Sequence, residues 1–259
     1  MAPNYIVPAV DRTVKVLQSL VHHPSGISLA KLAVETGIPK SSLFRILMTL
    51  RHHSLVTVDS ERETFCLGIK LVEWGSATLE RLDVKAVVHP YLVRLSAQTG
   101  QSFYLALLND AEVLLVDRAD TPDIWQIVTR LGLRSPVHCT ASGLSMIAEL
   151  PDEEINEMIE AKGLARFTPK TITTEKALKK KLAEVRRLGY AVADGDFKPD
   201  LYALAVGIRD YQGKIVASLM TALHSASARK SKKLVASLIK ILQDEGYDIS
   251  KRLGYRGDM

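Results

Sequence analysis

Residues 38–50 read IPKSSLFRILMTL, and this stretch determines how the first part of the chain is interpreted. Pro39 suits the first position of a helix, because the amide hydrogen that proline lacks would have no partner there. Apolar residues then recur at helical spacing and give the helix one buried side: Leu43, Ile46, Leu47 and Leu50. The pattern predicts a helix whose other side is free to meet a partner.

Two further helices are predicted before this one. The first spans residues 10–22 and would bury the apolar stripe Val10, Val14, Leu17 and Val21. Ser28 stands where an N-cap belongs, so its hydroxyl is expected to accept a free amide hydrogen of a second, short helix. Gly37 is expected to end that helix.

Alternating polar and apolar residues follow the third helix. Residues 55–59 and 64–67 predict two strands joined by a polar tip at residues 60–63. Three helices followed by a hairpin is the order of a winged helix, whose third helix enters the major groove of DNA while the hairpin lies against the adjacent backbone or minor groove. We therefore expect a winged helix-turn-helix domain over residues 1–68.

The outward side of the third helix supplies most of the candidate DNA contacts. Free amides at its start favour phosphate, Arg45 can reach a phosphate or a guanine edge, and Phe44 can touch a thymine methyl. Arg62 at the hairpin tip is a weaker candidate, because glutamates flank it. The predicted DNA-binding residues are Arg12, Ser28, Lys40, Ser41, Ser42, Phe44, Arg45, Thr49 and Arg62. The alternative is a small helical core whose polar side only meets water.

Composition and charge narrow the possible classes. The 259 residues are 47% hydrophobic, which excludes a disordered tail, and no apolar run is long enough for a membrane helix. The net charge of +5 is compatible with a polyanionic partner, and much of the excess of basic over acidic residues falls in the first 70 residues. Two cysteines, Cys66 and Cys139, are too few for a disulfide framework or a four-ligand zinc site, and the chain starts without an export signal. A reducing cytoplasm is the expected location.

The rest of the chain predicts a second, mixed domain. A helix at residues 69–81 would connect the two domains, and another is predicted at 84–98. Strands are predicted at 102–108, 113–117, 126–130, 201–209 and 215–223, and helices at 140–150, 152–161, 174–188 and 229–244. Asp152 and Thr174 are expected to cap helices, and Gly163, Gly189 and Gly246 to end them. Short turns between paired strands favour an antiparallel sheet flanked by helices, so the fold class is α+β.

Four segments resemble the IclR family of bacterial transcriptional regulators. They are residues 9–12 (AVDR), 38–47 (IPKSSLFRIL), 139–143 (CTASG) and 189–194 (GYAVAD), in the family's order and separation. The resemblance implies an N-terminal winged helix (1–68), a linker helix (69–83) and a C-terminal GAF-like effector domain (84–259). It also implies a homodimer or a dimer of dimers that binds operator DNA and responds to a small organic acid.

Residues 140–143 are the expected centre of the effector site. They open a predicted helix after the extended segment 136–139, so unpaired amides and small side chains would let a carboxylate approach. In the resembled family this segment lines the effector pocket. The alternative for this chain is a capped helix whose small residues only pack on the sheet. The candidate effector-binding residues are Phe103, Leu105, Trp125, Ile127, Leu133, Thr140, Ala141, Ser142, Gly143, Leu144, Met146, Leu201, Ala203 and Met220.

One departure from the family bears on the effector. Where related regulators place polar contacts, this chain has Ala193, Ala203, Met220 and Ala222. The resemblance then implies an aromatic or otherwise less polar acid in place of a small oxoacid, because apolar walls favour burial of a ring.

Catalysis and metal binding find little support in the sequence. No nucleophile-elbow, phosphate-loop, dinucleotide or zinc-protease motif occurs, so no catalytic residue, cofactor or metal is assigned. His138 and Cys139 are adjacent on an expected extended segment and would point to opposite sides. Asp194, Asp196 and Asp200 could act as acids, bases or cation ligands, but solvated loop carboxylates are the simpler interpretation. The lysine-rich runs at 179–181 and 229–233 are interpreted as solvated helix faces.

Two rival classes remain open. A small-molecule enzyme with a helical regulatory domain would show turnover without affinity for duplex DNA. An effector-independent DNA-binding protein would bind its operator identically whatever metabolites are added.

Overall fold

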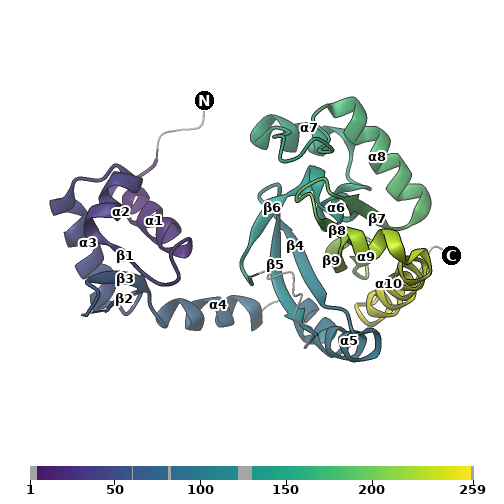
Figure 1. Ribbon diagram of the computed structural model, residues 1–259, viewed down its shortest axis with the longest axis horizontal. Helices are drawn as coiled ribbons and strands as arrows, with labels where there is room; N and C mark the ends of the chain where they lie inside the picture. Colours follow the sequence, from purple (N-terminus) through teal and green to yellow (C-terminus); the bar gives the residue numbers. More distant parts are fainter. Residues whose placement is uncertain (1–4, 60, 81–82, 122–129, 258–259) are drawn as a thin grey trace. The chain divides into compact units, whose positions relative to one another are not determined.

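The computed structural model describes residues 5–59, 61–80, 83–121 and 130–257. The chain divides into two compact units, residues 1–81 and 82–259 (Figure 1). Within the described residues, no helix is both long enough and apolar enough to cross a membrane.

The first unit is a helix-turn-helix followed by a wing. Its elements are α1 (Pro8–Val21), β1 (Ile27–Ser28), α2 (Leu29–Thr36), α3 (Lys40–His52), β2 (Val56–Asp59), β3 (Thr64–Leu67) and α4 (Lys70–Glu80). The three strands form an antiparallel sheet in the order β1-β3-β2. Gly37 ends α2 at φ +68°, a left-handed conformation that costs glycine little, and its amide donates to Ala33. The third helix and the hairpin are therefore confirmed.

The core of this unit joins all three helices to the sheet. Leu32, Leu43 and Leu47 are fully buried together with Val16 and Leu20 of α1. These two residues are four apart, so they lie one turn above each other on the same side of α1.

The predicted buried stripe of α1 is wrong. Val10, Val14 and Val21 are 59%, 46% and 54% exposed, and only Leu17 of that set packs partly against the core. Helix α1 has two apolar sides, and its sequence alone does not show which of them meets α2 and α3. The other side, which carries Val10, Val14 and Val21, is exposed in the described part of this unit.

Two details of the helix starts also differ from prediction. Ser28 is the N-cap of α2, but its side chain makes no capping hydrogen bond, because the residue lies in β1 and pairs with Thr64 of β3. Pro39 is the N-cap of α3 rather than its first residue. Both helices begin within one residue of the expected position.

The second unit is built on a six-stranded antiparallel sheet. Its strands are β4 (Phe103–Asn109), β5 (Glu112–Ala119), β6 (Arg134–Pro136), β7 (Ala191–Asp194), β8 (Leu201–Arg209) and β9 (Ile215–His224), in the order β6-β5-β4-β9-β8-β7. Its helices are α5 (Asp83–Thr99), the 3-10 turn η1 (Val137–Cys139), α6 (Ala141–Ile147), α7 (Asp152–Lys162), α8 (Glu175–Leu188), α9 (Ser225–Lys230) and α10 (Lys232–Arg252). The strands and helices predicted from residue 102 onward are largely found, but β6 and α9 were not predicted, and the helix predicted at 229–244 begins at Lys232 and runs to Arg252. Most of the strand predicted at 126–130 lies outside the described residues.

The helices cover both faces of this sheet. Helix α6 packs on the face that carries Ala203 and Ala205 of β8, whereas α10 approaches the opposite face at Val206 and Gly207. The caps at Thr174, Gly163 and Gly189 are as predicted, whereas Asp152 is the first residue of α7 and makes no capping bond.

Gly246 does not end a helix, because α10 runs through it to Arg252. A Cβ at this position would lie 2.6 Å from Cγ2 of Val206. The glycine therefore lets α10 approach β8 closely. A pattern of helix stops cannot distinguish this packing role from a helix end.

Candidate functional site

Helix α3 presents a polar outer side next to the wing. Lys40, Ser41, Phe44, Arg45 and Thr49 are exposed, and Phe44 is 47% exposed although it is a large apolar side chain. Residues four apart share one side of a helix, so 41, 45 and 49 form one stripe and 40 and 44 a second, adjacent one. Because the inward side is buried in the core of the unit, only this outer side of α3 is available to enter a groove of duplex DNA.

A surface groove brings together residues from three elements of this unit. It is lined by Ser28 at the start of α2, Lys40 and Phe44 of α3, and Arg62 in the wing turn, together with Leu29, Ala30, Val58, Glu63 and Phe65. The groove has a volume of about 430 Å³. Four of the nine predicted DNA-binding residues therefore converge on one feature.

The remaining predicted residues divide into two groups. Ser41, Arg45 and Thr49 extend the exposed side of α3, and the Thr49 hydroxyl donates to the Arg45 carbonyl oxygen at 2.9 Å. Ser42 is half-buried, and Arg12 is exposed on α1 but does not line the groove. These two are weaker candidates than the sequence suggested.

The cations of this surface differ in how well they are neutralised. Lys40 and Arg45 have no ion pair among the residues that the structure describes, so both charges are available to a phosphate or a base. Nε of Arg62 lies 3.8 Å from Oδ2 of Asp59. The other carboxylate oxygen of Asp59, Oδ1, accepts hydrogen bonds from the amides of Glu61 and Arg62 in the wing turn. Arg62 is thus held by the turn and partly neutralised.

The second unit contains a small, mostly apolar cavity between the sheet and the start of α6. It is lined by Val113, Leu115, Leu133, Ser135, Cys139, Thr140, Ala141, Ser142, Ala193, Phe197, Lys198, Leu201, Ala203 and Met220. Of the predicted effector-binding residues, Leu133, Thr140, Ala141, Ser142, Leu201, Ala203 and Met220 are among them. We call this space the Ser142 cavity.

Two predicted wall residues lie on the wrong face of the sheet. Phe103 pairs with Thr221, and Tyr104 pairs with Met220. Paired residues point to the same face, so Tyr104 shares the face of Met220, while Phe103 and Leu105 are buried on the other face. A shift of one residue decides which side a strand residue occupies, and the strand's own sequence is apolar on both sides.

Three further predicted residues, all on α6, do not line the Ser142 cavity. Leu144 and Met146 belong to the buried core cluster and do not line the Ser142 cavity. Gly143 packs against the backbone of Val137, where a Cβ would lie 2.4 Å from both the Cα and the carbonyl oxygen. Its small size serves the contact between η1 and α6 and not the approach of a ligand. Trp125 and Ile127 lie outside the described residues.

The polar groups at the start of α6 have distinct roles. The Thr140 hydroxyl donates to the Pro136 carbonyl at 2.7 Å and accepts from the Gly143 amide at 3.3 Å, so it is the helix cap. The Ser142 hydroxyl is buried and has no hydrogen-bond partner among the residues that the structure describes. A buried hydroxyl without a partner costs free energy, and a ligand that hydrogen-bonds to it removes that cost.

Several lining residues were not predicted from the sequence. Val113 and Leu115 alternate along β5 on the cavity face, a spacing that could have been used. Phe197 and Lys198 lie in the loop between β7 and β8, next to the 189–194 segment, but their position at the cavity depends on the fold of that loop.

His138 and Cys139 do point to different cavities, although the predicted reason is wrong. They lie in the 3-10 turn η1 and not on an extended segment. Burial, with a smaller contribution from the charge of Asp196, raises the pKa of the Cys139 thiol to about 12. The thiol therefore stays protonated at neutral pH, which removes its use as a nucleophile.

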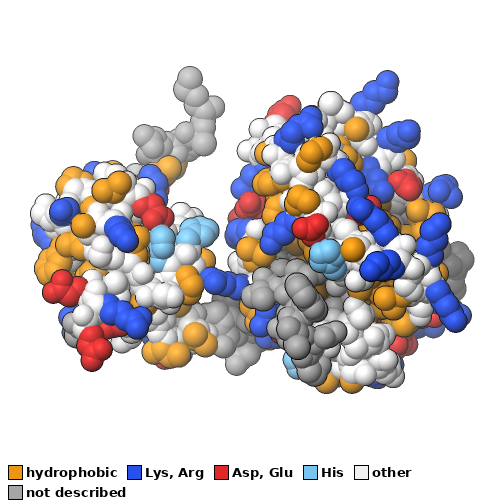
Figure 2. Space-filling view, viewed as in Figure 1, with side chains coloured by type: hydrophobic (Ala, Val, Ile, Leu, Met, Phe, Trp, Pro, Cys, Tyr) orange, Lys and Arg blue, Asp and Glu red, His pale blue; other side chains and the backbone are white. Residues whose placement is uncertain are grey.

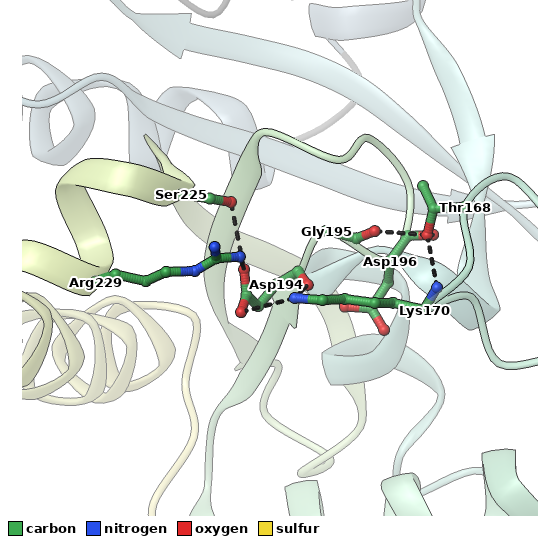
Figure 3. Close-up of polar contacts among 7 residues, drawn as sticks. All are labelled: Thr168, Lys170, Asp194, Gly195, Asp196, Ser225 and Arg229. Carbon is green, nitrogen blue, oxygen red and sulfur yellow. Dashed lines mark hydrogen bonds and ion pairs between the residues drawn. The ribbon is translucent and has the colours of Figure 1, made fainter.

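The loop that carries Phe197 and Lys198 is anchored by a polar network (Figure 3). Asp194 at the end of β7 pairs with Lys170 at 3.1 Å and with Arg229 of α9 at 3.3 Å. Burial raises the pKa of Asp194, but the hydrogen bonds and charges of Lys170 and Arg229 outweigh this, so the pKa lies below its usual value of 3.8. The Thr168 hydroxyl donates to the Gly195 carbonyl at 2.7 Å.

The carboxylates of this loop are therefore not all solvated. Asp194 is ion-paired, and burial raises the pKa of Asp196, which is half-buried. Asp200 is exposed. Within the described residues, no group of three or more His, Cys, Asp or Glu side chains could hold a metal ion.

Replacing Asp194 by asparagine is expected to reduce stability in a pH-dependent way. A carboxylate with a depressed pKa in the folded state stabilises it above the unfolded pKa, and this contribution is lost as the pH falls through the folded value. We expect Asp194→Asn to lower the free energy of unfolding by about 1 kcal/mol or less at pH 7, because both ion pairs are partly exposed. Thermal melts at falling pH should show the deficit disappearing below about pH 4.

The exposed Asp200 in the same loop is the matched control, and Asp200→Asn should melt like the wild type. A deficit of Asp194→Asn that is equal at neutral and acidic pH would contradict the role of its charge.

Basic residues of the second unit are spread out. Lysine and arginine side chains are scattered over the visible face of this unit (Figure 2). In the two lysine-rich runs, Lys179 pairs with Asp152 and Glu175, Lys181 with Glu184, and Arg229 with Asp194. These pairs favour a structural role on the helix surfaces.

The sequence and the fold are similar to those of known regulators. The sequence matches two family models, described as the IclR helix-turn-helix domain (residues 9–60) and the bacterial transcriptional regulator IclR C-terminal domain (residues 76–251). It is 28% identical to the HTH-type transcriptional regulator XynR of Escherichia coli K12 over 250 residues, which cover 96% of this chain and 98% of XynR.

Solved structures show the same architecture. An IclR transcriptional regulator from Alicyclobacillus acidocaldarius is 28% identical with a TM-score of 0.82, covering 95% of this chain and 99% of that one. An IclR homologue from Microbacterium hydrocarbonoxydans in complex with 4-hydroxybenzoate is 25% identical with a TM-score of 0.80, covering 95% and 98%.

The winged helix and its α+β partner unit define a DNA-binding transcriptional regulator and not an enzyme. Both matched domains are regulator domains, and together they span most of the chain. The chain belongs to the IclR family.

Proposed function

We propose that a small organic acid of low polarity binds in the Ser142 cavity and modulates binding of the protein to its operator. The observation that carries this proposal is the buried hydroxyl of Ser142, a residue that lines a cavity whose other walls are mostly apolar; within the described part of the chain this hydroxyl has no hydrogen-bond partner. Apolar walls with a few placed polar groups are typical of small-molecule sites.

The chemistry of the rim favours a carboxylate. Lys198 lines the cavity, is exposed, and its Nζ lies 6.0 Å from the centre of the Phe197 ring. The lysine can pair with an acid group while the alanines and Met220 contact an apolar body. A small, highly polar oxoacid would leave these walls unused.

Binding of a ring requires the cavity to widen. Its volume is about 70 Å³, which is less than the roughly 300 Å³ at the lower end for ligand sites. Phe197 and Lys198 belong to a loop, so outward movement of this loop is the proposed route of entry. The Microbacterium homologue with 4-hydroxybenzoate supports an aromatic acid as the ligand class.

Ligand binding is tested by a thermal-shift comparison of benzoate with glyoxylate. A ligand that binds only the native state raises the melting temperature, so benzoate should raise it more than glyoxylate at equal concentration. Lys198→Met should weaken benzoate binding by about tenfold, which corresponds to about 1.4 kcal/mol. Ala203→Leu, which fills part of the cavity, should also weaken it.

The matched control is Lys176→Met, which removes an exposed lysine of α8 outside the cavity. It should bind benzoate like the wild type. If benzoate raises the melting temperature of all variants equally, its site lies elsewhere and the proposal fails.

We also propose that two copies assemble on a pseudo-palindromic operator. The uncovered apolar side chains of α1, Val10, Val14 and Val21, suit contact with a second copy. Half-sites should then lie about 10 base pairs apart, or a multiple of this, because each copy must address the same side of the duplex. Helix α4, the last element of the first unit, is the proposed route by which effector binding changes that geometry, so operator affinity should differ with and without effector.

A further inference from the structure

A second cavity lies across η1 from the Ser142 cavity. It is lined by apolar side chains of α7 and its surroundings, including Ile155, Met158, Ile159, Leu164 and Phe167, and by His138. Its volume is about 200 Å³, almost three times that of the Ser142 cavity. A dry cavity of about 150 Å³ is sufficient for benzene, so this space can hold one substituted ring. We call it the His138 cavity.

The polar groups of the His138 cavity do not suit an acid. Glu112, one of its lining residues, already accepts from Lys162 at 3.3 Å and from Arg134 at 3.4 Å. Both cations are therefore paired, and a carboxylate would compete with Glu112 for them. This is the opposite of the Ser142 cavity, where Lys198 has no ion pair among the described residues.

His138 offers a hydrogen-bond acceptor. Its Nε2 lies 3.0 Å from the carbonyl oxygen of Ala165, which can only accept, so Nε2 holds the hydrogen. Burial lowers the pKa of His138, so the ring is neutral at neutral pH and Nδ1 has a free lone pair. Nδ1 has no hydrogen-bond partner in the described part of the chain.

The segment 165–171 connects this cavity to the loop of the other one. Ala165 accepts from His138, and the Phe167 ring lies 6.2 Å from His138 and 5.1 Å from Phe197. Thr168 and Thr171 donate to the carbonyl oxygens of Gly195 and Asp196 at 2.7 and 2.6 Å. A movement of segment 165–171 at the His138 cavity would therefore be transmitted to the loop residues that line the Ser142 cavity.

We propose that the His138 cavity is a second ligand site, which takes a small uncharged aromatic molecule with one hydrogen-bond donor, such as a phenol, and that segment 165–171 couples it to the Ser142 cavity. The ring fills the apolar space beside α7, and the hydroxyl donates to Nδ1 of His138. Acids are directed to the Ser142 cavity and neutral phenols to this one.

Methionine-methyl NMR of the full-length protein tests the site without any substitution, because Met158 lines the His138 cavity and Met220 lines the Ser142 cavity. The two signals are assigned with Met158→Leu and Met220→Leu. Phenol should shift the Met158 signal in a saturable manner, with a Kd of about 1 mM, and leave Met220 nearly unchanged. Toluene, which lacks the donor, should bind about 3- to 10-fold more weakly.

Variants separate this site from the proposed effector site. Ile159→Phe fills the His138 cavity and should abolish the phenol shift, whereas Ala161→Phe on the exposed side of the same helix should not. Lys198→Met should leave phenol binding unchanged. Phenol that shifts Met220 in place of Met158, that fails to saturate, or that binds Ile159→Phe as it binds the wild type would overturn the proposal.

The coupling is measured separately. Saturating phenol should change the Kd of benzoate, read from the Met220 signal, by at least about twofold. An unchanged benzoate Kd would overturn the coupling. If benzoate does not bind at all, the effector proposal fails while the phenol result still stands or falls by the Met158 signal.

Discussion

Arg45→Ala is expected to weaken binding to the operator by about 1–3 kcal/mol, or roughly 5- to 150-fold, if its guanidinium reads a base. Arg45 lies on the exposed stripe of α3, one turn from Ser41, and has no ion pair among the described residues. Its guanidinium can make two hydrogen bonds to a guanine edge, and alanine removes both. The measurement uses DNA duplexes selected for binding to the wild-type protein. The ratio of the Kd values of Arg45→Ala and the wild type for these duplexes, at one salt concentration, gives the fold-change.

The pattern over sequences distinguishes two roles of Arg45. A base contact predicts that the loss is large for the selected operator and small for random duplex, so specificity falls with affinity. A phosphate contact predicts an equal loss for all sequences and a shallower dependence on salt.

Lys180→Ala is the matched control, because it removes one exposed cation from α8 in the second unit and changes the net charge equally. It should bind the operator like the wild type. If Lys180→Ala and Arg45→Ala weaken binding to the same extent, the effect is one of overall charge and α3 is not the reading element.

Gly143→Ala is expected to destabilise the second unit by about 1–3 kcal/mol, although it adds a single methyl group. The new Cβ would lie 2.4 Å from two backbone atoms of Val137 and 2.7 Å from a third. Backbone cannot move aside as the end of a flexible side chain can, so η1 and α6 must separate. Because Cys139–Ser142 lie at this junction and line the Ser142 cavity, benzoate binding should weaken as well.

Thermal melting measures the first effect. A loss of 1 kcal/mol lowers the melting temperature of a unit of this size by about 2–4 °C. Gly75→Ala in α4 is the comparison, since a Cβ there meets nothing within 4 Å. Alanine favours helix over glycine by about 0.5–1 kcal/mol, so this variant should melt at the same or a higher temperature. A Gly143→Ala protein as stable as the wild type would contradict the packing role of this glycine.

The winged helix could be predicted because its signals are local. Helical spacing from Leu43 to Leu50, the left-handed Gly37 and the alternating hairpin each depend on neighbours within a few residues. The prediction failed for α1, where two apolar sides compete and contacts with distant α2 and α3 select Val16 and Leu20.

The candidate ligand site could be predicted only in part. Thr140, Ala141 and Ser142 of the predicted segment 140–143 line one cavity with Ala203 and Met220, as the sequence predicts, because motif and strand pattern agree there. Phe197, Lys198 and the alternating Val113 and Leu115 were missed, and the second cavity beside α7 was not foreseen at all.

The amino-acid order was sufficient for the class of protein, for helix α3 with its exposed polar side, and for most element boundaries, since these follow from periodicities and turns over short distances. Which side of each strand and helix faces a cavity depended on pairings between distant residues, such as Tyr104 with Met220 and Gly246 with Val206. A one-residue change of register reverses a strand's faces without altering its composition. The lining of both cavities is therefore decided by how the sheet and its helices pack together, and not by the sequence of any single strand or helix.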